Sequence, residues 1–238
     1  MDYRRFEESH TEQEHHEFAS ALSQLKQRGA SLLVVGNLPD QEYARACSNL
    51  LGDTTAAQRR RLFVTTDNDL PSITDRLPSH DQLTPETARL VTWTAQERSA
   101  AVASQTDHRQ IPEVQVPGNQ LSGLGITISE EIAEFESIAD GLAPAELRVC
   151  FDSLEALLSE YPHEDVFRFL HVLIGRIRSV NAMGHFHLPI DRTSEEVQVF
   201  ADLFDIVLEL RVAHNEVQQR FHLQDAEITS DWLWLSGL

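Results

Sequence analysis

The chain of 238 residues has only one lysine, Lys26, among its 19 basic residues, whereas aspartate and glutamate together number 38. The formal net charge is therefore −19. Acidic surfaces that are poor in lysine stay hydrated in concentrated salt, where a Debye length of about 3 Å screens their self-repulsion. The composition predicts a halophilic protein, with an acidic mesophilic protein as the alternative. Because phosphate neutralisation dominates nucleic-acid affinity, this charge also argues against nucleic acid as a partner.

Cysteine and long apolar runs are scarce as well. Cys47 falls in a predicted helix and Cys150 in a predicted buried strand, so we expect reduced core residues, not a disulfide or a metal pair. No apolar run reaches about 18 residues and no leader sequence opens the chain, which predicts a cytoplasmic protein without a membrane span or signal peptide. Hydrophobic residues make up 41% of the chain, enough for one α/β domain.

Strands and helices alternate along most of the sequence. Apolar runs predict strands at 31–35, 61–66, 88–93, 114–116, 147–151 and 182–188, and amphipathic patterns predict helices at 44–51, 125–142 and 166–178. Such alternation predicts a parallel sheet with right-handed crossovers. The strands predicted at 206–211 and 218–223 form an antiparallel hairpin instead.

The sequence predicts a separate N-terminal helix and a single domain. Residues 1–27 are expected to form a polar segment and a helix that begins near Glu12, and residues 28–238 to form a single domain. Trp232 and Trp234 are expected to cover the edge of their own sheet, with docking on a partner as the alternative.

The most informative segment follows the first predicted strand. Residues 36–43 read Gly-Asn-Leu-Pro-Asp-Gln-Glu-Tyr, where a G-x-x-x-x-G-K-[ST] phosphate loop would lie. Gly36 matches, but Gln41, Glu42 and Tyr43 replace the second glycine, the phosphate-binding lysine and the Mg²⁺-binding hydroxyl. Two like charges about 4 Å apart repel by about 4 kcal/mol at an effective dielectric of 20, so a carboxylate at position 42 opposes nucleotide binding.

A second segment supplies the other half of such a site. The strand predicted at 147–151 ends in Asp152-Ser153-Leu154 before another helix. In P-loop ATPases, a buried strand delivers an aspartate to the Mg²⁺ shell in this way. The alternative is that Asp152 or Ser153 caps the following helix.

These segments resemble the KaiC/RecA-type ATPases, whose strand closes as apolar-Asp-Ser-Leu. The similarity covers roughly residues 28–225 and includes an Arg-rich helix at 166–178 and an aspartate followed by an apolar strand at 202–211. The chain is also similar to uncharacterised haloarchaeal proteins labelled HTR-like. The resemblance implies a RecA/KaiC-like three-layer sandwich, with Gly36, Asp152 and Ser153 as vestigial residues of an ATP and Mg²⁺ site.

Loss of the loop lysine sets the functional prediction. We expect no catalytic residue and no resident cofactor or metal. The chain is then a non-catalytic regulatory or signalling module that binds a protein partner or forms a homo-oligomer. One alternative is a nucleotide-binding protein with an altered loop. A transcriptional regulator is less favoured, because the sequence has no helix-turn-helix pattern.

Several other polar residues could also take part in chemistry. Asp67 or Asp69 occupies the position at which relatives orient the attacking water. His185 and His187 fall on one side of a predicted strand and, with His163 or His171, could form a zinc site. A packed and hydrogen-bonded strand face is the favoured interpretation.

The arginines and serines give weaker signals. Arg168, Arg176 and Arg178 could reach a neighbouring subunit's phosphates, although a solvated helix face is favoured. The run Arg59–Arg61 is interpreted as surface residues, with an acidic partner or nucleic acid as the alternative. The absence of a G-x-S-x-G motif excludes a serine hydrolase of that type.

Overall fold

The computed structural model describes the chain in segments. The described residues are 3–52, 58–66, 76, 84–93, 111–116, 118 and 120–235. The two carboxylates considered for water orientation, Asp67 and Asp69, lie outside them.

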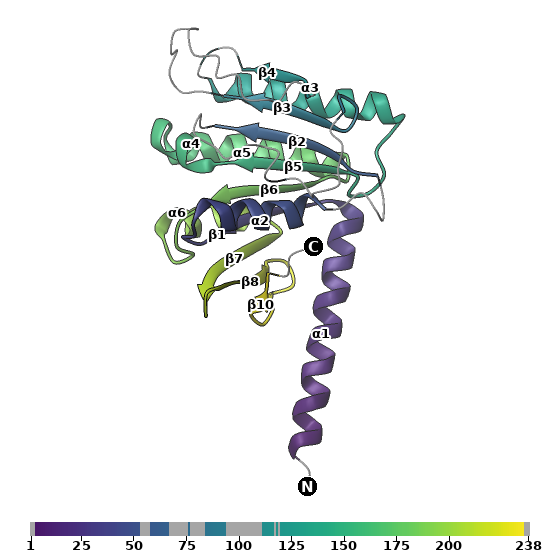
Figure 1. Ribbon diagram of the computed structural model, residues 1–238, viewed down its shortest axis with the longest axis vertical. Helices are drawn as coiled ribbons and strands as arrows, with labels where there is room; N and C mark the ends of the chain where they lie inside the picture. Colours follow the sequence, from purple (N-terminus) through teal and green to yellow (C-terminus); the bar gives the residue numbers. More distant parts are fainter. Residues whose placement is uncertain are drawn as a thin grey trace.

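One mixed β-sheet organises the described part of the chain (Figure 1). Its strands are β1 (Ala30–Val35), β2 (Arg60–Thr65), β3 (Ala88–Thr92), β4 (Glu113–Gln115), β5 (Leu147–Asp152), β6 (Met183–Leu188), β7 (Ile206–Ala213), β8 (Glu216–Leu223), β9 (Ile228–Thr229) and β10 (Leu233–Trp234). The spatial order is β10-β8-β7-β1-β6-β5-β2-β3-β4, and β9 pairs with β8. Neighbours from β7 to β4 are parallel, whereas β8 is antiparallel to its partners. The predicted α/β class, with a mostly parallel sheet and an antiparallel C-terminal hairpin, is confirmed.

The hairpin turn is shorter than the sequence predicts. His214 and Asn215 have φ of 53° and 63°, the left-handed values that a two-residue turn between twisted strands requires. The strands β7 and β8 therefore extend into residues 212–217, which were expected to connect them.

The C-terminal edge confirms one prediction about the tryptophans. Trp232 contacts two cations of its own sheet, with the guanidinium carbons of Arg211 and Arg220 3.7 and 4.3 Å from its ring centre. Such contacts with cations stabilise an aromatic ring that covers an edge. Trp234 remains 47% exposed.

Helices cover both faces of the sheet and create three layers (Figure 1). The helices are α1 (Tyr3–Arg28), α2 (Asp40–Leu51), α3 (Leu121–Ala139), α4 (Leu154–Glu160), α5 (His163–Ser179) and α6 (Glu195–Phe200), followed by a 3₁₀ turn (Ala201–Leu203). The helices α3, α4 and α5 pack on one face, and α2 with the C-terminal part of α1 packs on the other. The helix α1 begins well before Glu12, where the sequence predicted its start, and its N-terminal half projects from the body.

Strand alternation gives the two faces different compositions. In β5, Val149 and Phe151 join the large apolar core beneath α3 and α5, whereas Cys150 packs on the α2 side. In β6, Phe186 joins the same apolar core. Neighbouring positions of a strand point to opposite faces, so His185 and His187 lie on the α2 side with Cys150. The polar residues of the central strands are thereby gathered under one helix.

In the part of the chain that the structure describes, no helix is both long and apolar enough to cross a membrane.

Candidate functional site

Four parallel strands bring their carboxyl ends to one edge of the sheet. β6 lies between β1 and β5, and β2 follows β5. This arrangement places Gly36, just after β1, and Asp152, the last residue of β5, one strand apart at the same edge. Ligands of open α/β sheets bind at this edge. The two segments singled out in the sequence are therefore brought together.

The glycine of the candidate loop is fixed by its surroundings. Gly36 has φ +125°, and a Cβ atom there would lie 2.2 Å from the carbonyl oxygen of Leu210. Its amide donates a hydrogen bond to the carbonyl of Ile190 at 2.8 Å. Only glycine fits this position, and its amide already has a partner within the protein.

The side chain of Tyr43 fills the space between the loop and α2. Its hydroxyl donates a hydrogen bond to the carbonyl oxygen of Gly36, and the residue is 9% exposed. The ring meets His187 edge-on at 5.6 Å between centroids. Burial raises the pKa of the Tyr43 phenol well above its ordinary value, with a further contribution from the carboxylates of Glu155 and Asp152. The phenol is therefore neutral and holds the loop against its own helix.

Asp152, the candidate Mg²⁺ ligand, is engaged by an arginine. Its carboxylate forms an ion pair with Arg76, and the two side chains are 12% and 7% exposed. Nη1 of Arg76 also lies 3.8 Å from Sγ of Cys150. Arg76 lies between β2 and β3 in the sequence and is buried, at 6% exposure.

Ser153 stands at the N-cap position of α4, but its side chain makes no capping hydrogen bond. Its amide donates to Oγ1 of Thr66 at 3.0 Å, and that hydroxyl donates to the Ser153 carbonyl at 2.6 Å. The peptide bond between Asp152 and Ser153 is cis. The side-chain capping considered for Asp152 and Ser153 is therefore replaced by an ion pair and by backbone contacts.

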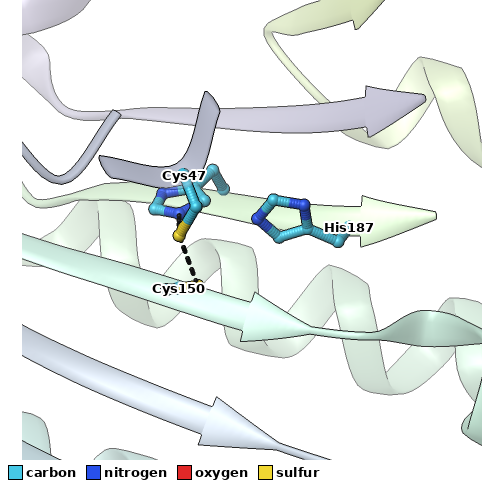
Figure 2. A group of neighbouring side chains, drawn as sticks. Cys47, Cys150 and His187 are labelled. Carbon is cyan, nitrogen blue, oxygen red and sulfur yellow. Dashed lines mark hydrogen bonds between the residues drawn. The ribbon is translucent and has the colours of Figure 1, made fainter. Parts of the chain in front are cut away.

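A buried group of two cysteines and two histidines lies beneath α2 (Figure 2). Cys47 comes from α2, Cys150 from β5, and His185 and His187 from β6, and none of the four is more than 2% exposed. Sγ of Cys47 lies 3.1 Å from Sγ of Cys150 and 3.2 Å from Nε2 of His185.

The protonation of this group follows from its burial. Burial and the neighbouring Cys47 raise the pKa of the Cys150 thiol to about 11. Burial likewise lowers the pKa of His185. Without a bound cation, burial therefore keeps the Cys150 thiol and the His185 imidazole neutral.

The structure corrects the grouping that was considered for a zinc site. His163 and His171 belong to α5, which packs on the opposite face of the sheet from His185 and His187. The neighbours of the two histidines are instead Cys47 and Cys150, which the sequence analysis treated as ordinary core residues. No sequence signal marks this group, because Cys150 and His185 become neighbours only through the register of two parallel strands.

The run Arg59–Arg61 does not lie on the surface as predicted. Arg60 and Arg61 are 5% and 1% exposed, because β2 is a central strand and not an edge. Nη2 of Arg61 donates to the carbonyl of Gly52 at 2.6 Å, just beyond the end of α2. Arg60 pairs with Glu146 at 2.8 Å. These cations stabilise the negative end of a helix and a neighbouring carboxylate.

A third arginine extends the same pattern. Arg148, in β5, directs Nη1 toward the carbonyl of Leu50 at 3.5 Å. Burial, together with the charges of Arg59 and Arg61, lowers the pKa of Arg148 to about 10. The carboxyl end of α2 is therefore surrounded by buried positive charge.

The arginines of α5 are paired within the chain. Arg168 pairs with Glu164 and Asp165 on its own helix, which confirms the solvated face expected there. Arg176 and Arg178 instead reach other elements: Arg176 pairs with Glu136 of α3 at 2.5 Å, and Arg178 with Asp205 at 2.9 Å. Because β7 is parallel to β1, Asp205 lies at the amino edge of the sheet, opposite Gly36.

An apolar groove of about 940 Å³ runs between α3 and α5. Its walls include Leu121, Ile126, Ala133, Phe169, Val172 and Leu173. Ile126 and Val172 are 59% and 71% exposed. Exposed apolar side chains that adjoin a groove are typical of interaction surfaces.

Comparison with known families places this chain. A family model matches residues 29–210, and the protein belongs to that family, a family of unknown function named DUF7504. The match includes both β1 with its loop and β5 with Asp152. No curated protein matches the chain.

Proposed function

We propose that this protein is a non-catalytic, RecA/KaiC-like regulatory module that has kept the sheet of a P-loop ATPase and lost the use of its nucleotide site. The observation that carries the proposal is the occupation of both halves of that site by the protein's own side chains. The Tyr43 hydroxyl binds the Gly36 carbonyl, and the Arg76 guanidinium pairs with Asp152. In a working site, these positions serve phosphate and Mg²⁺.

The charges in the site support the same proposal. Glu42 takes the place of the lysine, and its Oε2 is buried without a hydrogen-bond partner among the described residues. A nucleotide triphosphate would add negative charge beside this carboxylate. A Mg²⁺ ion would have to displace Arg76 from Asp152, at the cost of a buried ion pair. The substitutions therefore act together against binding of Mg-ATP.

The groove between α3 and α5 provides the interaction surface of the module, and we assign it to a second copy of the same chain. The two helices have 19 and 17 residues, so they present a face roughly 25 Å long and 20 Å wide. A dimer through this face would bury about 1,000 Å² in total, which is the lower limit for a specific protein–protein interface. Glu130 on α3 and Arg168 on α5 both line the groove. A two-fold axis through the groove would set the Arg168 of one copy against the Glu130 of the other.

Thermal unfolding with Mg-ATP tests the loss of the nucleotide site. In about 3 M KCl we expect no shift on adding millimolar Mg-ATP. A ligand at about 100 times its dissociation constant would add about 2.7 kcal/mol, a shift of roughly 5–10 °C. A shift of that size that disappears in Asp152→Asn and persists in Asp165→Asn, an exposed aspartate on α5, would overturn the proposal and favour the nucleotide-binding alternative.

Sedimentation equilibrium tests the assignment of the groove. We expect the wild type to be dimeric and Val172→Glu to be monomeric, because a charge at this position would be buried in the interface. Val199→Glu is the matched control, since Val199 is 41% exposed on α6, away from the groove. A monomeric wild type, or a Val172→Glu variant that still dimerises, contradicts the assignment.

A further inference from the structure

The buried group of Cys47, Cys150, His185 and His187 has no part in the function proposed above. These residues come from α2, β5 and β6, three elements that are far apart in the sequence. Figure 2 shows Cys47, Cys150 and His187 close together over the strands of the sheet. Each residue offers one ligand atom, and the four atoms all lie within 4.8 Å of one another.

We propose that these four residues bind one Zn²⁺ ion in a closed structural site. Two thiolates and two imidazoles are a common ligand set for tetrahedral zinc. Bond lengths of about 2.3 Å to sulfur and 2.0–2.1 Å to nitrogen require ligand atoms roughly 3.3–3.8 Å apart. The observed separations run from 3.1 Å between the sulfurs to no more than 4.8 Å within the group, so small side-chain movements complete the geometry.

Charge balance favours a metal ion of this class. A divalent ion with two thiolates and two neutral imidazoles forms a neutral group, which can be buried without a large desolvation penalty. Binding of Zn²⁺ releases the two thiol protons to solvent, since the metal ligands are thiolates. Sulfur and nitrogen ligands select zinc over Mg²⁺ or Ca²⁺, which prefer oxygen.

His187 provides a second observation that points to a ligand. Its Nε2 atom is buried and has no hydrogen-bond partner among the described residues, and the side chain is 2% exposed. An imidazole nitrogen in this situation normally binds a protein group, a water molecule or a metal ion. Coordination to zinc would satisfy it at the position where Cys47 and Cys150 already converge.

The neighbourhood suits a thiolate site. Nη1 of Arg76 lies 3.8 Å from Sγ of Cys150, where its charge stabilises a metal-bound thiolate. Tyr43 covers the His187 ring, 5.6 Å away between centroids, on the side of the loop. Four protein ligands leave no open coordination position, which is typical of a structural site and not of a catalytic one.

The ion would fix α2 to the centre of the sheet. Cys47 lies one turn beyond Tyr43 on the same helix, and Cys150 lies two residues before Asp152. A metal cross-link between Cys47 and Cys150 would fix the loop at Gly36, which Tyr43 contacts, relative to the Arg76–Asp152 pair. The inference is independent of the nucleotide proposal, because it concerns the layer beneath the loop and not the loop itself.

The test uses the full-length protein, expressed without a histidine tag and purified under reducing conditions in about 3 M KCl. Elemental mass spectrometry of the purified protein should find about one zinc per chain. After removal of zinc with a chelator, Co²⁺ should restore one equivalent with thiolate-to-cobalt charge-transfer absorption and the intense visible bands of tetrahedral cobalt. About two protons should be released per ion bound.

Variants separate metal binding from folding. His187→Gln and Cys47→Ser should lose stoichiometric cobalt binding, whereas His171→Gln, an exposed histidine on α5, should retain it. Circular dichroism identifies which variants are folded, and only folded variants are compared. Addition of a chelator should lower the unfolding temperature of the wild type and of His171→Gln, but not that of His187→Gln.

Two results would overturn the proposal. One is a folded, reduced wild type that takes up neither zinc nor cobalt. The other is a folded His187→Gln variant that binds cobalt with the charge-transfer band and proton release of the wild type. A native protein whose mass is lower by two hydrogens and whose thiols do not react would show a Cys47–Cys150 disulfide, and this also contradicts a metal site.

Discussion

The two faces of the central sheet are built from the same strands but differ sharply in chemistry. Beneath α3 and α5, the strands contribute residues such as Val149, Phe151 and Phe186, which form one continuous apolar core. Beneath α2, the same strands contribute arginine, cysteine and histidine side chains that are equally buried. Apolar burial stabilises the fold directly, whereas buried polar groups are tolerated only when they are paired.

This difference shows which face has been shaped by something besides stability. A parallel sheet covered by helices on both sides needs only apolar residues on each face. The face beneath α2 nevertheless holds an ion pair between Arg76 and Asp152, a Cys–His group, and arginines at the end of a helix. The nucleotide-site remnant and the zinc site proposed above both lie on this face.

Truncation of a large side chain on the apolar face should have the largest effect on stability. Phe186 is fully buried, stacks on Phe151 at 5.5 Å and meets Phe204 at 5.3 Å between ring centroids. Phe186→Ala should lower the free energy of unfolding by about 4 kcal/mol, from lost transfer energy and the cavity left behind. Chemical denaturation in high salt measures it. Phe167→Ala, which removes a ring that is 37% exposed, should cost less than half as much, and equal costs would contradict the comparison.

On the polar face, the largest loss of stability is expected from a buried charge that is left without its partner. Arg76→Met leaves the Asp152 carboxylate buried and unpaired, and should lower the free energy of unfolding by about 3 kcal/mol. Adding Asp152→Asn removes the unpaired charge, so the double variant should recover most of the loss. A double variant as unstable as the sum of the two single variants would show that the ion pair does not account for the cost.

The sequence predicts the framework well because the relevant signals are local. Apolar runs mark the strands β1 to β8, their alternation with helices gives the parallel order, and the runs at 206–211 and 218–223 give the hairpin. The turn was misplaced because His214 and Asn215 adopt left-handed conformations that the flanking residues do not reveal. The start of α1 was misplaced because its first turns are polar and lack a helical stripe.

The composition of the site could not be predicted in the same way. Cys47 and Cys150 are 103 residues apart in the sequence, and nothing in the helix that carries Cys47 indicates which strand it crosses. Arg61 was interpreted as a surface residue because charge usually marks the surface. It is buried because β2 is a central strand, and its guanidinium donates to the carbonyl of Gly52. Such contacts depend on tertiary packing alone.

Removal of the Tyr43 hydroxyl should have a moderate effect on stability. Tyr43→Phe removes the hydrogen bond to the Gly36 carbonyl and should lower the free energy of unfolding by about 1 kcal/mol. The phenol keeps its proton in the folded state at pH values where the unfolded chain releases it. Stability is therefore retained below pH about 10 and falls as the pH rises beyond it. Denaturation curves across that range should show a smaller loss in Tyr43→Phe, and an unchanged loss would contradict the assignment.

The smallest effect on stability is expected from the loss of an exposed charge that does not face the sheet. Arg168 is 72% exposed in its side chain and, among the described residues of its own chain, pairs with Glu164 and Asp165. Pairs of this kind contribute about 0.3–0.5 kcal/mol at low ionic strength and less in concentrated salt. In the Val172→Glu background, which removes the contact proposed with a second copy, Arg168→Gln should therefore leave the unfolding midpoint nearly unchanged in about 3 M KCl. In the same background, Arg61→Gln, on the polar face, should lower the midpoint clearly because it removes a buried contact with the end of α2. Equal unfolding midpoints for Arg168→Gln and Arg61→Gln would mean that a buried arginine stabilises the sheet no more than an exposed one does. The contrast between the two faces would then rest on the Cys–His group and the Arg76–Asp152 pair alone.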